Sequence, residues 1–588
     1  MSLDFSVIVS TLEKMEETSS RLELTDHLVD LFKNTPPDIL DKVIYLIQGK
    51  IAPDYEGIEL GLAEKMIVRA VVNSSGVTTE KLYQIYQKTG DLGESTKLVM
   101  GKKMQTTLLK EQVTVERIYS TFYRISRTLG SGSQEIKLRL LSSLFSDSSA
   151  TACKYIVKFA LGTLRLGVAD YSILDALSLA FTNDKKLRNV LEPAYNVSSD
   201  LGKVGKLLAT GGLPAVASLK IQLFIPIRPM LAERVRTADE ILDKMNGTAA
   251  AAEYKIDGER VQIHAGSDKT EIFSRRLENI TSHYPDIVRS MNKIRSKNII
   301  LEAEVVAVDE STGEYLPFQE LMHRRRKYNV SEAVEKYPVS LNLFDILYKG
   351  GHEVTHLPYL ARRAMLESLV RKTNDSTIKI ITQKTVQNPV QIEELMSKAI
   401  ESGCEGLMLK QLDSPYRAGA RGYAWTKIKR EYRSELADSL DLVVVGALFG
   451  KGRRTGRYGA LLLATYDQKS NKFRSVCKVG SGFKDSDLET LFKELQLHML
   501  KNQHPRVSST LEMDVWFEPS VVIEVIASEI TLSPSHSVGM NEIRSGFGLS
   551  LRFPKFTGKI RFDKNPEDST SEKELLSMYK QQLRAIKA

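Results

Sequence analysis

The spacing of apolar residues changes near residue 210, and this change limits the fold more than any other feature of the sequence. Before it, apolar residues recur every three or four positions, as at Phe5, Val9, Leu12 and Met15, which is the spacing of a buried helical stripe. After it, short runs rich in β-branched residues alternate with turns that contain glycine or asparagine, and such runs predict strands. We therefore expect a multi-domain protein with an all-α first part and strand-containing later parts.

Two breaks divide the chain into three predicted domains. Residues 211–214, Gly-Gly-Leu-Pro, interrupt the helical pattern, and a charged stretch near residue 430 precedes a second set of strands. We expect an all-α helical domain over residues 1–212 and an α+β domain over 213–430. A small β-barrel of the oligonucleotide-binding (OB) fold is expected over 431–588. A chain of 588 residues is also too long for one hydrophobic core.

The strands that carry this expectation can be placed individually. In the α+β domain we predict them at residues 249–256, 261–265, 299–308, 340–348 and 406–410. In the barrel domain we predict them at residues 442–448, 460–466, 473–479 and 521–527, with a terminal helix over 572–588.

The charge balance favours a polyanionic partner. The chain has 82 Lys and Arg against 73 Asp and Glu, a formal charge of +9, and each phosphate neutralised by such a side chain releases counterions. Basic residues recur through the helical part at Lys102, Lys103, Arg124, Arg127, Lys158 and Arg165. Either a solvated helical face or a nucleic-acid surface explains them.

Cysteine usage and hydropathy exclude several classes of protein. Cys153, Cys404 and Cys477 are too few and too widely spaced for a disulfide framework or a four-cysteine zinc module. The first residues lack the basic and apolar regions of a signal peptide, and no apolar run approaches the roughly 20 residues that cross a bilayer. We expect no membrane segment and an intracellular, cytoplasmic location, associated with the nucleoid, or with the nucleus if the source is eukaryotic.

The strongest local pattern is Glu-Tyr-Lys-Ile-Asp-Gly-Glu-Arg at residues 253–260, on a predicted strand that runs into a glycine turn. Strand alternation puts Glu253, Lys255 and Asp257 on one face and the residues between them on the other. A lysine attacks phosphorus only as the free amine, and nearby cations or desolvation lower its pKa toward that state. Lys255 is therefore the candidate nucleophile.

This octet resembles the motif of the covalent nucleotidyltransferases, the superfamily that comprises ATP-dependent DNA ligases, RNA ligases and mRNA capping enzymes. Six further motifs of that superfamily follow in order. They are SRRLENIT with Arg275, LEAEVVA with Glu304, NLFDIL with Phe344, EGLMLK with Glu405, RGYAWTKIK with Arg421, Lys427 and Lys429, and LRFPKFTGKIRFDK with Arg561 and Lys564. The helical part is also similar to the DNA-binding domain of archaeal and eukaryotic replicative ligases.

The resemblance implies a role for each motif residue. Lys255 would carry AMP, and Phe344 would stack on the purine. Glu405 would hold a divalent ion, Mg²⁺ or Mn²⁺, and Glu304 would either hydrogen-bond the ribose or help to hold that ion. The residues implied in ATP binding are Glu253, Arg260, Arg275, Glu304, Phe344, Arg421, Lys427, Lys429, Arg561 and Lys564.

Each motif also has a plain structural explanation when taken alone. Phe344 could be a core aromatic, Glu304 an ordinary acid at a strand edge, and residues 425–429 a basic strand. Alternation puts Glu405 opposite Lys410, so that only one of them needs to face a pocket, and we choose Glu405. The glycine-rich loop at 450–459 carries four cations and best fits a contact with a phosphate backbone.

Together the motifs predict an ATP-dependent DNA ligase that seals nicks in double-stranded DNA during replication, repair and recombination. Nicked duplex DNA is the expected partner, a sliding clamp is a candidate partner, and a monomer is expected. The alternatives are an RNA ligase, a capping-type enzyme, which has no such helical domain, and a DNA-binding scaffold without catalysis. An NAD-dependent ligase is disfavoured because it would need the four-cysteine zinc module.

Overall fold

The computed structural model describes the chain as two compact units, Met1–Tyr83 with Leu92–Lys429 and Gln84–Asp91 with Arg430–Ala588. Its described residues are all except 1, 103–110, 165, 236, 246–248, 295, 309–314, 317, 325–329, 372, 374, 430–438, 451–455, 528, 553 and 588. Among them, no helix is both long and apolar enough to cross a membrane.

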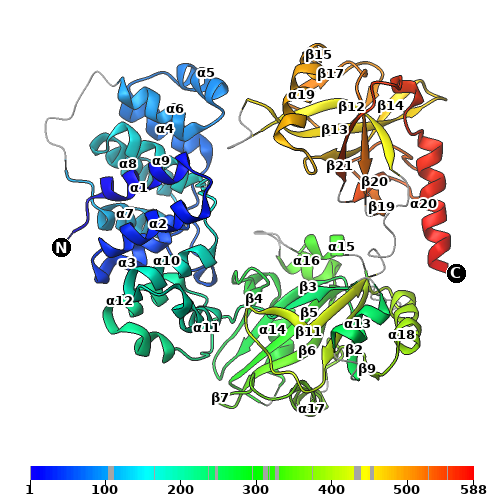
Figure 1. Ribbon diagram of the computed structural model, residues 1–588, viewed down its shortest axis with the longest axis horizontal. Coiled ribbons are helices and arrows are strands. Elements are labelled where there is room, and N and C mark those ends of the chain that lie inside the picture. Colours follow the sequence, from blue (N-terminus) through cyan, green and yellow to red (C-terminus); the bar gives the residue numbers. More distant parts are fainter. Residues whose placement is uncertain are drawn as a thin grey trace. The chain divides into compact units, whose positions relative to one another are not determined.

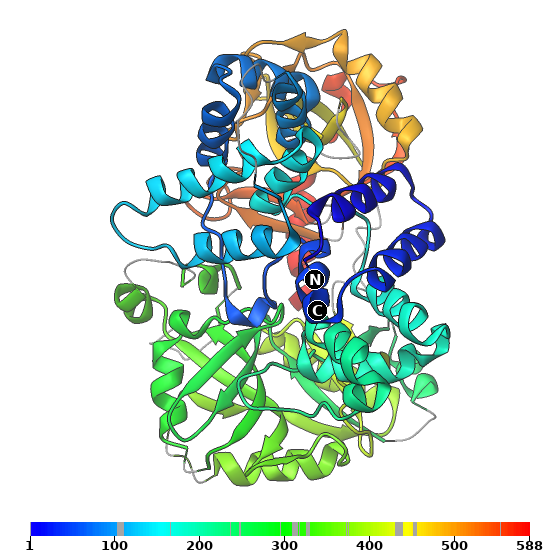
Figure 2. The ribbon, with the colours of Figure 1, turned by 90° about the vertical axis from the view of Figure 1, so that its left-hand side faces the viewer.

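Helices build the N-terminal region, as the blue to teal ribbons show in Figures 1 and 2. Several of them begin at a capping side chain, such as Asp4, Ser20, Thr114 or Ser149, which accepts a hydrogen bond from the first turn. Their bounds are α1 Phe5–Glu17, α2 Arg21–Lys33, α3 Leu40–Ile47, α4 Glu64–Ser75, α5 Thr79–Thr89, α6 Leu92–Gly101, α7 Val115–Arg127, α8 Ser133–Asp147, α9 Ala150–Leu161, α10 Asp170–Thr182, α11 Arg188–Ser198 and α12 Leu201–Ala217.

The predicted break in the helical pattern falls inside α12. Gly212 has φ 65° and ψ −167°, which are not helical, so α12 is two helical pieces joined by a kink. Beyond α12, an extended stretch leads to the first strand of the α+β region. Ser199 donates to the carbonyl of Pro226, and Gln262 bonds both the N–H and the carbonyl of Ile227. This stretch is thus fastened on both sides.

Two sheets make up the α+β region of the first unit. One has the strand order β1-β11-β10-β2-β9, and the other has the order β4-β3-β5-β6-β7 with β8 beside β6. The strands are β1 Leu231–Arg234, β2 Ala250–Lys255, β3 Glu259–Ala265, β4 Thr270–Ser274, β5 Ile299–Ala307, β6 Val339–Lys349, β7 His352–Glu353, β8 Ile378–Ile380, β9 Gln383–Val386, β10 Gly406–Gln411 and β11 Arg421–Lys429. The helices are α13 Ala238–Lys244, α14 Pro285–Asn292, α15 Phe318–Met322, α16 Val330–Lys336, α17 Tyr359–Val370 and α18 Pro389–Glu401.

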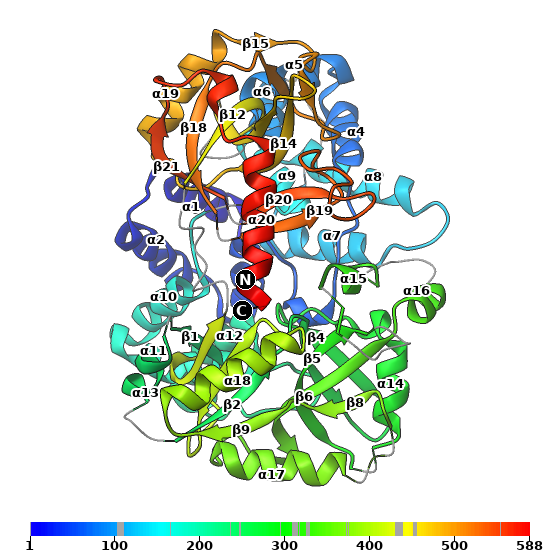
Figure 3. The ribbon, with the colours of Figure 1, turned by 90° about the vertical axis from the view of Figure 1, so that its right-hand side faces the viewer.

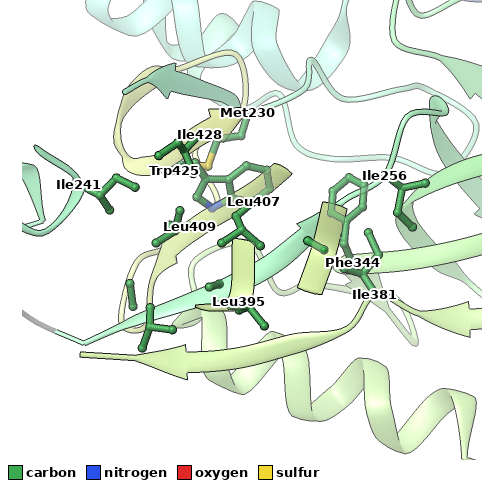
Figure 4. Close-up of a cluster of buried hydrophobic side chains, with 14 of the residues drawn as sticks. Met230, Ile241, Ile256, Phe344, Ile381, Leu395, Leu407, Leu409, Trp425 and Ile428 are labelled. Atoms are coloured by element: carbon green, nitrogen blue, oxygen red, sulfur yellow. The ribbon is translucent and has the colours of Figure 1, made fainter. Parts of the chain in front are cut away.

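Helices cover the outer faces of both sheets, as Figure 3 shows for α14, α17 and α18. One core joins the first sheet to α13 and α18 and reaches the inner face of the second sheet. Figure 4 shows part of this core, with Trp425 beside Met230 and Phe344 beside Ile256 and Ile381. A second core lies between β3, β5 and β6 and the helices α14 and α17. The inner faces of the two sheets are therefore left to form a site between them.

The second unit is rich in strands that curl around a large hydrophobic core, and a smaller apolar cluster packs on the other face of β12 and β13. Its main sheet has the order β15-β17-β12-β13-β14-β16, with β18 pairing β12 and β21, while β19 and β20 form a separate pair. The strands are β12 Leu440–Phe449, β13 Tyr458–Asp467, β14 Lys472–Val479, β15 Met499–Leu500, β16 Val507–Ser508, β17 Val515–Phe517, β18 Val522–Ile526, β19 Glu529–Ser533, β20 Gly548–Arg552 and β21 Lys555–Ile560. The helix α19 spans Asp485–Gln496, and α20, Glu572–Lys587, packs against β13 and β19 (Figure 3).

Candidate active site

A cavity of about 150 Å³ lies between the two sheets of the first unit. Both sheets contribute to its walls. The lining residues are Leu231, Ala232, Glu253, Tyr254, Lys255, Ile256, Arg260, Arg275, Glu304, Phe344, Ile381, Met408, Lys410, Arg421, Trp425 and Lys427. Eight of the residues singled out in the sequence are among them: Glu253, Lys255, Arg260, Arg275, Glu304, Phe344, Arg421 and Lys427.

Strand register explains why the reactive groups of the first sheet meet. Gly406 on β10 pairs with Lys255 on β2 and with Lys429 on β11, and two residues further along β10 the partners are Glu253 and Lys427. Because residues paired across a sheet lie on the same face, these four side chains share one face. The predicted grouping of Glu253 with Lys255, and of Lys427 with Lys429, is confirmed.

Lys255 shares a carboxylate with a second lysine. Its Nζ lies 2.5 Å from Glu405 Oε2, and the Nζ of Lys429 lies 2.8 Å from the same oxygen. The N–H of Glu405 also donates to the carbonyl of Lys255. Burial alone would raise the pKa of Glu405, but the charge of Lys255, a hydrogen bond with Asp257 and the charge of Lys429 hold it well below its ordinary value. The anion of Glu405 is thus maintained beside the Lys255 amine.

Of Glu405 and Lys410, only Lys410 is among the residues that line the cavity, so the choice of Glu405 as the pocket-facing residue is not borne out by the lining. Strand β10 begins at Gly406, so Glu405 lies just outside it and does not follow the alternation of the strand. Lys410 lines the cavity, while Glu405 contacts Lys255. The site therefore uses both residues.

Lys410 and Glu253 form a buried ion pair in the wall of the cavity. The distance from Nζ to Oε2 is 2.7 Å, and the two side chains are 1% and 2% exposed. Tyr359 donates to the other oxygen of Glu253 at 2.6 Å. The ammonium group of Lys410 lies 4.2 Å from the ring centre of Trp425 and 4.8 Å from that of Phe344. Burial lowers the pKa of Lys410, while the charge of Glu253 opposes that effect.

Arg260 anchors the second sheet to the same cavity. Its guanidinium pairs with the buried carboxylate of Glu302 and donates to the carbonyl of Met230 at 2.9 Å. The guanidinium carbon is 5.4 Å from the ring centre of Phe344 and 5.8 Å from that of Trp425. Several of the hydrogen-bond donors of Arg260 are therefore used by groups of the protein itself. Its positive charge also lies beside the rings of Phe344 and Trp425.

Glu304 is a carboxylate whose pKa is raised by its surroundings in this site. Glu304 lies on β5 and is paired with Arg260 on the neighbouring strand β3. Burial raises the pKa of Glu304 to about 7, although Lys255 and Arg260 oppose the rise. On the opposite wall, burial and the cations of Lys255 and Arg275 lower the pKa of Lys427. Opposite charges are thus concentrated around Lys255.

The carboxylates fit a metal ion that also binds a substrate. Among the described residues, no group of three or more His, Cys, Asp or Glu side chains could hold a metal by itself. Mg²⁺ commonly takes only one or two protein carboxylates, together with water and substrate phosphates. Glu304 and Glu405 supply that kind of donor set, because each lies close enough to Lys255 to interact with its charge.

Two of the singled-out cations belong to the second unit. Arg561 and Lys564 follow β21, and both bind Asp441. Of the predicted phosphate-contacting loop at 450–459, residues 451–455 lie outside the described residues. In the helical region, Lys103 and Arg165 do so as well.

Sequence reasoning missed several residues that line the cavity. Leu231, Ala232, Ile381 and Met408 come from segments without a motif, and no signal in the sequence could have assigned them. Alternation also puts Trp425 on the strand face of Lys427 and Lys429, and Trp425 lines the cavity as well.

Comparison with known proteins finds matches over nearly the whole chain. The family model "DNA ligase N terminus" matches residues 4–178, "ATP dependent DNA ligase domain" matches 229–429 and "ATP dependent DNA ligase C terminal region" matches 454–564. A relative named "DNA ligase" from Nitrosopumilus maritimus (strain SCM1) is 52% identical over 581 residues, which cover 99% of this chain and 98% of the relative.

Two further similarities agree with these matches. A relative named "DNA ligase" from Cenarchaeum symbiosum (strain A) is 52% identical over 585 residues, 99% of each chain. A solved structure titled "Pmar-Lig_PreS3" has the same fold, with a TM-score of 0.54 and 18% identity, and covers 94% of this chain and 99% of that one.

Proposed function

Because the chain belongs to the ATP-dependent DNA ligase family and seals nicks in DNA, we propose that Lys255 is the nucleophile that carries AMP between ATP and the nick. The observation that carries this assignment is the partly exposed Lys255 amine, which is held in a cavity against Glu405 and beside two further lysines. The neighbouring lysines favour the free amine that attacks phosphorus, whereas the contact with Glu405 favours the ammonium form until that carboxylate is engaged elsewhere.

Three in-line transfers account for sealing. Lys255 Nζ forms a bond to the α-phosphorus of ATP, and the bond from that phosphorus to pyrophosphate breaks. The 5′-phosphate at the nick then attacks the same phosphorus, and the bond to Nζ breaks. Finally the 3′-hydroxyl loses its proton to solvent and bonds to the phosphorus of the 5′-phosphate, and the bond from that phosphorus to AMP breaks. Lys255 loses a proton to solvent before the first transfer, and Glu405, 2.5 Å away, stays ionised beside it.

The cavity supports specific roles for its other residues. The ring of Phe344 would stack on the adenine, and Glu253, Arg260 and Glu304 would line the nucleoside end. Arg275, Arg421, Lys427 and Lys429 would meet the α-phosphate, where negative charge develops during transfer. Arg561 and Lys564 would meet the pyrophosphate.

A divalent cation completes the proposed site. Glu304 and Glu405 would hold Mg²⁺ or Mn²⁺, and the bound ion would neutralise negative charge on the phosphates. Lys427 and Lys429, which lie on β11, would neutralise the same negative charge on the phosphates. Because the Lys429 ammonium already shares Glu405 with Lys255, it would keep that carboxylate in place when the amine of Lys255 turns to phosphorus.

We also propose the finer domain assignment made from the sequence. It places a DNA-binding domain at residues 1–212, an adenylation domain at 213–430 and an OB-fold domain at 431–588. The curled antiparallel sheet around β12, β13 and β18 supports an OB fold. A capping-type enzyme is a weaker candidate, because the helical region matches the DNA ligase N-terminal model.

One experiment tests the proposed chemistry. Incubation with ATP labelled at the α-phosphate should give a covalent adduct, and a nicked duplex should discharge it with formation of a sealed strand. The same incubation with labelled GTP is the control for a capping-type activity. An adduct from GTP that forms as readily as the one from ATP, or an adduct that a nick does not discharge, would contradict the proposal.

A further inference from the structure

We propose that Asp441 positions Arg561 and Lys564 for the pyrophosphate and is therefore a positioning residue for the first transfer. This inference rests on the proposed function of those two cations. All four side chains that carry it, including Asp563, belong to the second unit, so it depends only on contacts within that unit.

The two cations sit on one short turn. The N–H of Lys564 donates to the carbonyl of Arg561 at 3.2 Å, which closes a four-residue turn directly after β21. The N–H of Arg561 donates to the carbonyl of Val522 on β18, so the backbone at the start of the turn is fixed to the sheet. Two positive charges so close in sequence repel each other, and a carboxylate between them would offset that repulsion.

Asp441 supplies that carboxylate. Its Oδ2 lies 2.8 Å from Arg561 Nη1 and 2.7 Å from Lys564 Nζ. Because both contacts end on one oxygen, the two nitrogens are at most about 5.5 Å apart. That spacing suits two donors that face neighbouring oxygens of one pyrophosphate.

Asp441 is itself rigidly held. It lies at the start of β12, where its N–H donates to Thr570 Oγ1 and its carbonyl accepts from the Thr570 N–H. Its side chain is only 13% exposed. Its second oxygen, Oδ1, is buried and has no hydrogen-bond partner among the described residues. The side-chain hydrogen bonds of Asp441 within the described chain therefore go to the two cations.

The cations keep donors for a ligand. Arg561 uses Nε and Nη2 for Asp563, at 2.9 and 2.7 Å, and one hydrogen of Nη1 for Asp441. A guanidinium has five N–H groups and an ammonium has three, so both side chains retain free donors. Arg561 is 24% exposed and Lys564 is 32% exposed. Asp441 and Asp563 thus orient the Arg561 guanidinium, and Asp441 also orients the Lys564 ammonium. The remaining N–H groups of both cations stay available to a ligand.

A paired variant tests this role. Asp441→Asn removes the shared charge but keeps the shape of the side chain. Asp467→Asn is the matched control, because Asp467 is a carboxylate of the same unit, is paired with Arg474 and is also 13% exposed. Each variant is assayed for self-adenylation with ATP, for release of AMP from the adenylated protein by pyrophosphate, and for sealing of a nick that already carries AMP on its 5′-phosphate.

We expect Asp441→Asn to slow both reactions that involve pyrophosphate by about 10- to 100-fold, as loss of an orienting partner commonly does. Sealing of the pre-adenylated nick should be unchanged, because that step contains no pyrophosphate. Asp467→Asn should behave as the unaltered protein in all three assays. In an Arg561→Ala, Lys564→Ala background, Asp441→Asn should add no further loss, since its partners are gone.

The outcomes separate this inference from the function on which it rests. If Asp441→Asn adenylates normally while the double variant is slow, the positioning role is wrong and the pyrophosphate role of the cations stands. If the double variant also adenylates normally, the proposed role of the cations fails, and the inference fails with it. Equal loss of all three reactions in Asp441→Asn, together with a lower thermal midpoint than Asp467→Asn, would mean that Asp441 only supports folding.

Discussion

At the scale of single residues, the site holds carboxylates and lysines close together, and the burial of one carboxylate lowers the free energy of unfolding. Glu405 is kept ionised by two lysines, whereas the pKa of Glu304 is raised by burial to about 7. A buried carboxylate that must ionise for function destabilises the folded chain above that pH. We infer that Glu304 is retained for its chemistry and not for folding.

Replacement of Glu304 by Gln should therefore stabilise the metal-free protein at high pH. Between the ordinary value of 4.5 and about 7, the folded chain keeps a proton on Glu304 that the unfolded chain has lost. The free energy of unfolding of the unaltered protein thus falls as pH rises through this window. In denaturant titrations the free energy of unfolding of Glu304→Gln should equal that of the unaltered protein at about pH 5. At about pH 8 it should be higher by on the order of 1–2 kcal/mol.

The exposed acid Glu489 on α19 provides the control for that comparison. Glu489→Gln should show the same dependence on pH as the unaltered protein. The interpretation fails if Glu304→Gln loses as much stability between the two pH values as the unaltered protein does.

At the scale of elements, the interior strands were predictable and the edges were not. The strands predicted at 299–308 and 473–479 are confirmed as β5 and β14, because long apolar runs between turns leave few other structures. Short strands such as β8 and β16 were missed, since two or three residues carry no periodicity and their pairing is decided by distant neighbours. The terminal helix at 572–588 is confirmed as α20.

In the candidate site, too, features that depend on a single strand were predictable, and contacts between distant segments were not. Alternation predicts correctly that Lys427 and Lys429 share a face, because it depends only on the strand itself. The burial of Lys410 beneath Phe344 and Trp425 depends on three strands that meet in space, and no local pattern contains that information. The contact of Arg561 with Asp441 was hidden for the same reason, since Asp441 lies 120 residues away in the sequence.

Strand β10 gives a prediction about backbone packing. A Cβ at Gly406 would lie 2.2 Å from the carbonyl oxygen of Ile428 on β11, and the φ of Gly406 is +155°. Gly406→Ala should force β10 and β11 apart, cost about 1–3 kcal/mol of stability and displace Glu405 from Lys255. Gly422→Ala on β11 is the control, since nothing lies within 4 Å of its Cβ. Equal adenylation rates and thermal midpoints for the two variants would contradict this account.

At the scale of the whole molecule, nucleotide chemistry and DNA binding should be separable. Every residue that lines the cavity lies between Leu231 and Lys427, downstream of the helical region. Removal of residues 1–212 should therefore spare self-adenylation but greatly reduce sealing at moderate salt, where remaining phosphate contacts are already weakened. Sealing by the shortened protein at the rate of the full chain would remove the helical region from DNA binding.

The central claim is that Lys255 carries AMP, and mapping of the adduct tests it most directly. The full chain is incubated with labelled ATP and Mg²⁺, digested, and the modified peptide is identified by mass spectrometry. Lys269→Ala serves as a control, because Lys269 pairs with Glu271 at a 55% exposed position away from the cavity. We predict an acid-labile AMP on Lys255 in the unaltered protein and in Lys269→Ala, and no adduct in Lys255→Ala, which should still bind nicked DNA. An adduct on any other residue, or one that persists in Lys255→Ala, would contradict the account.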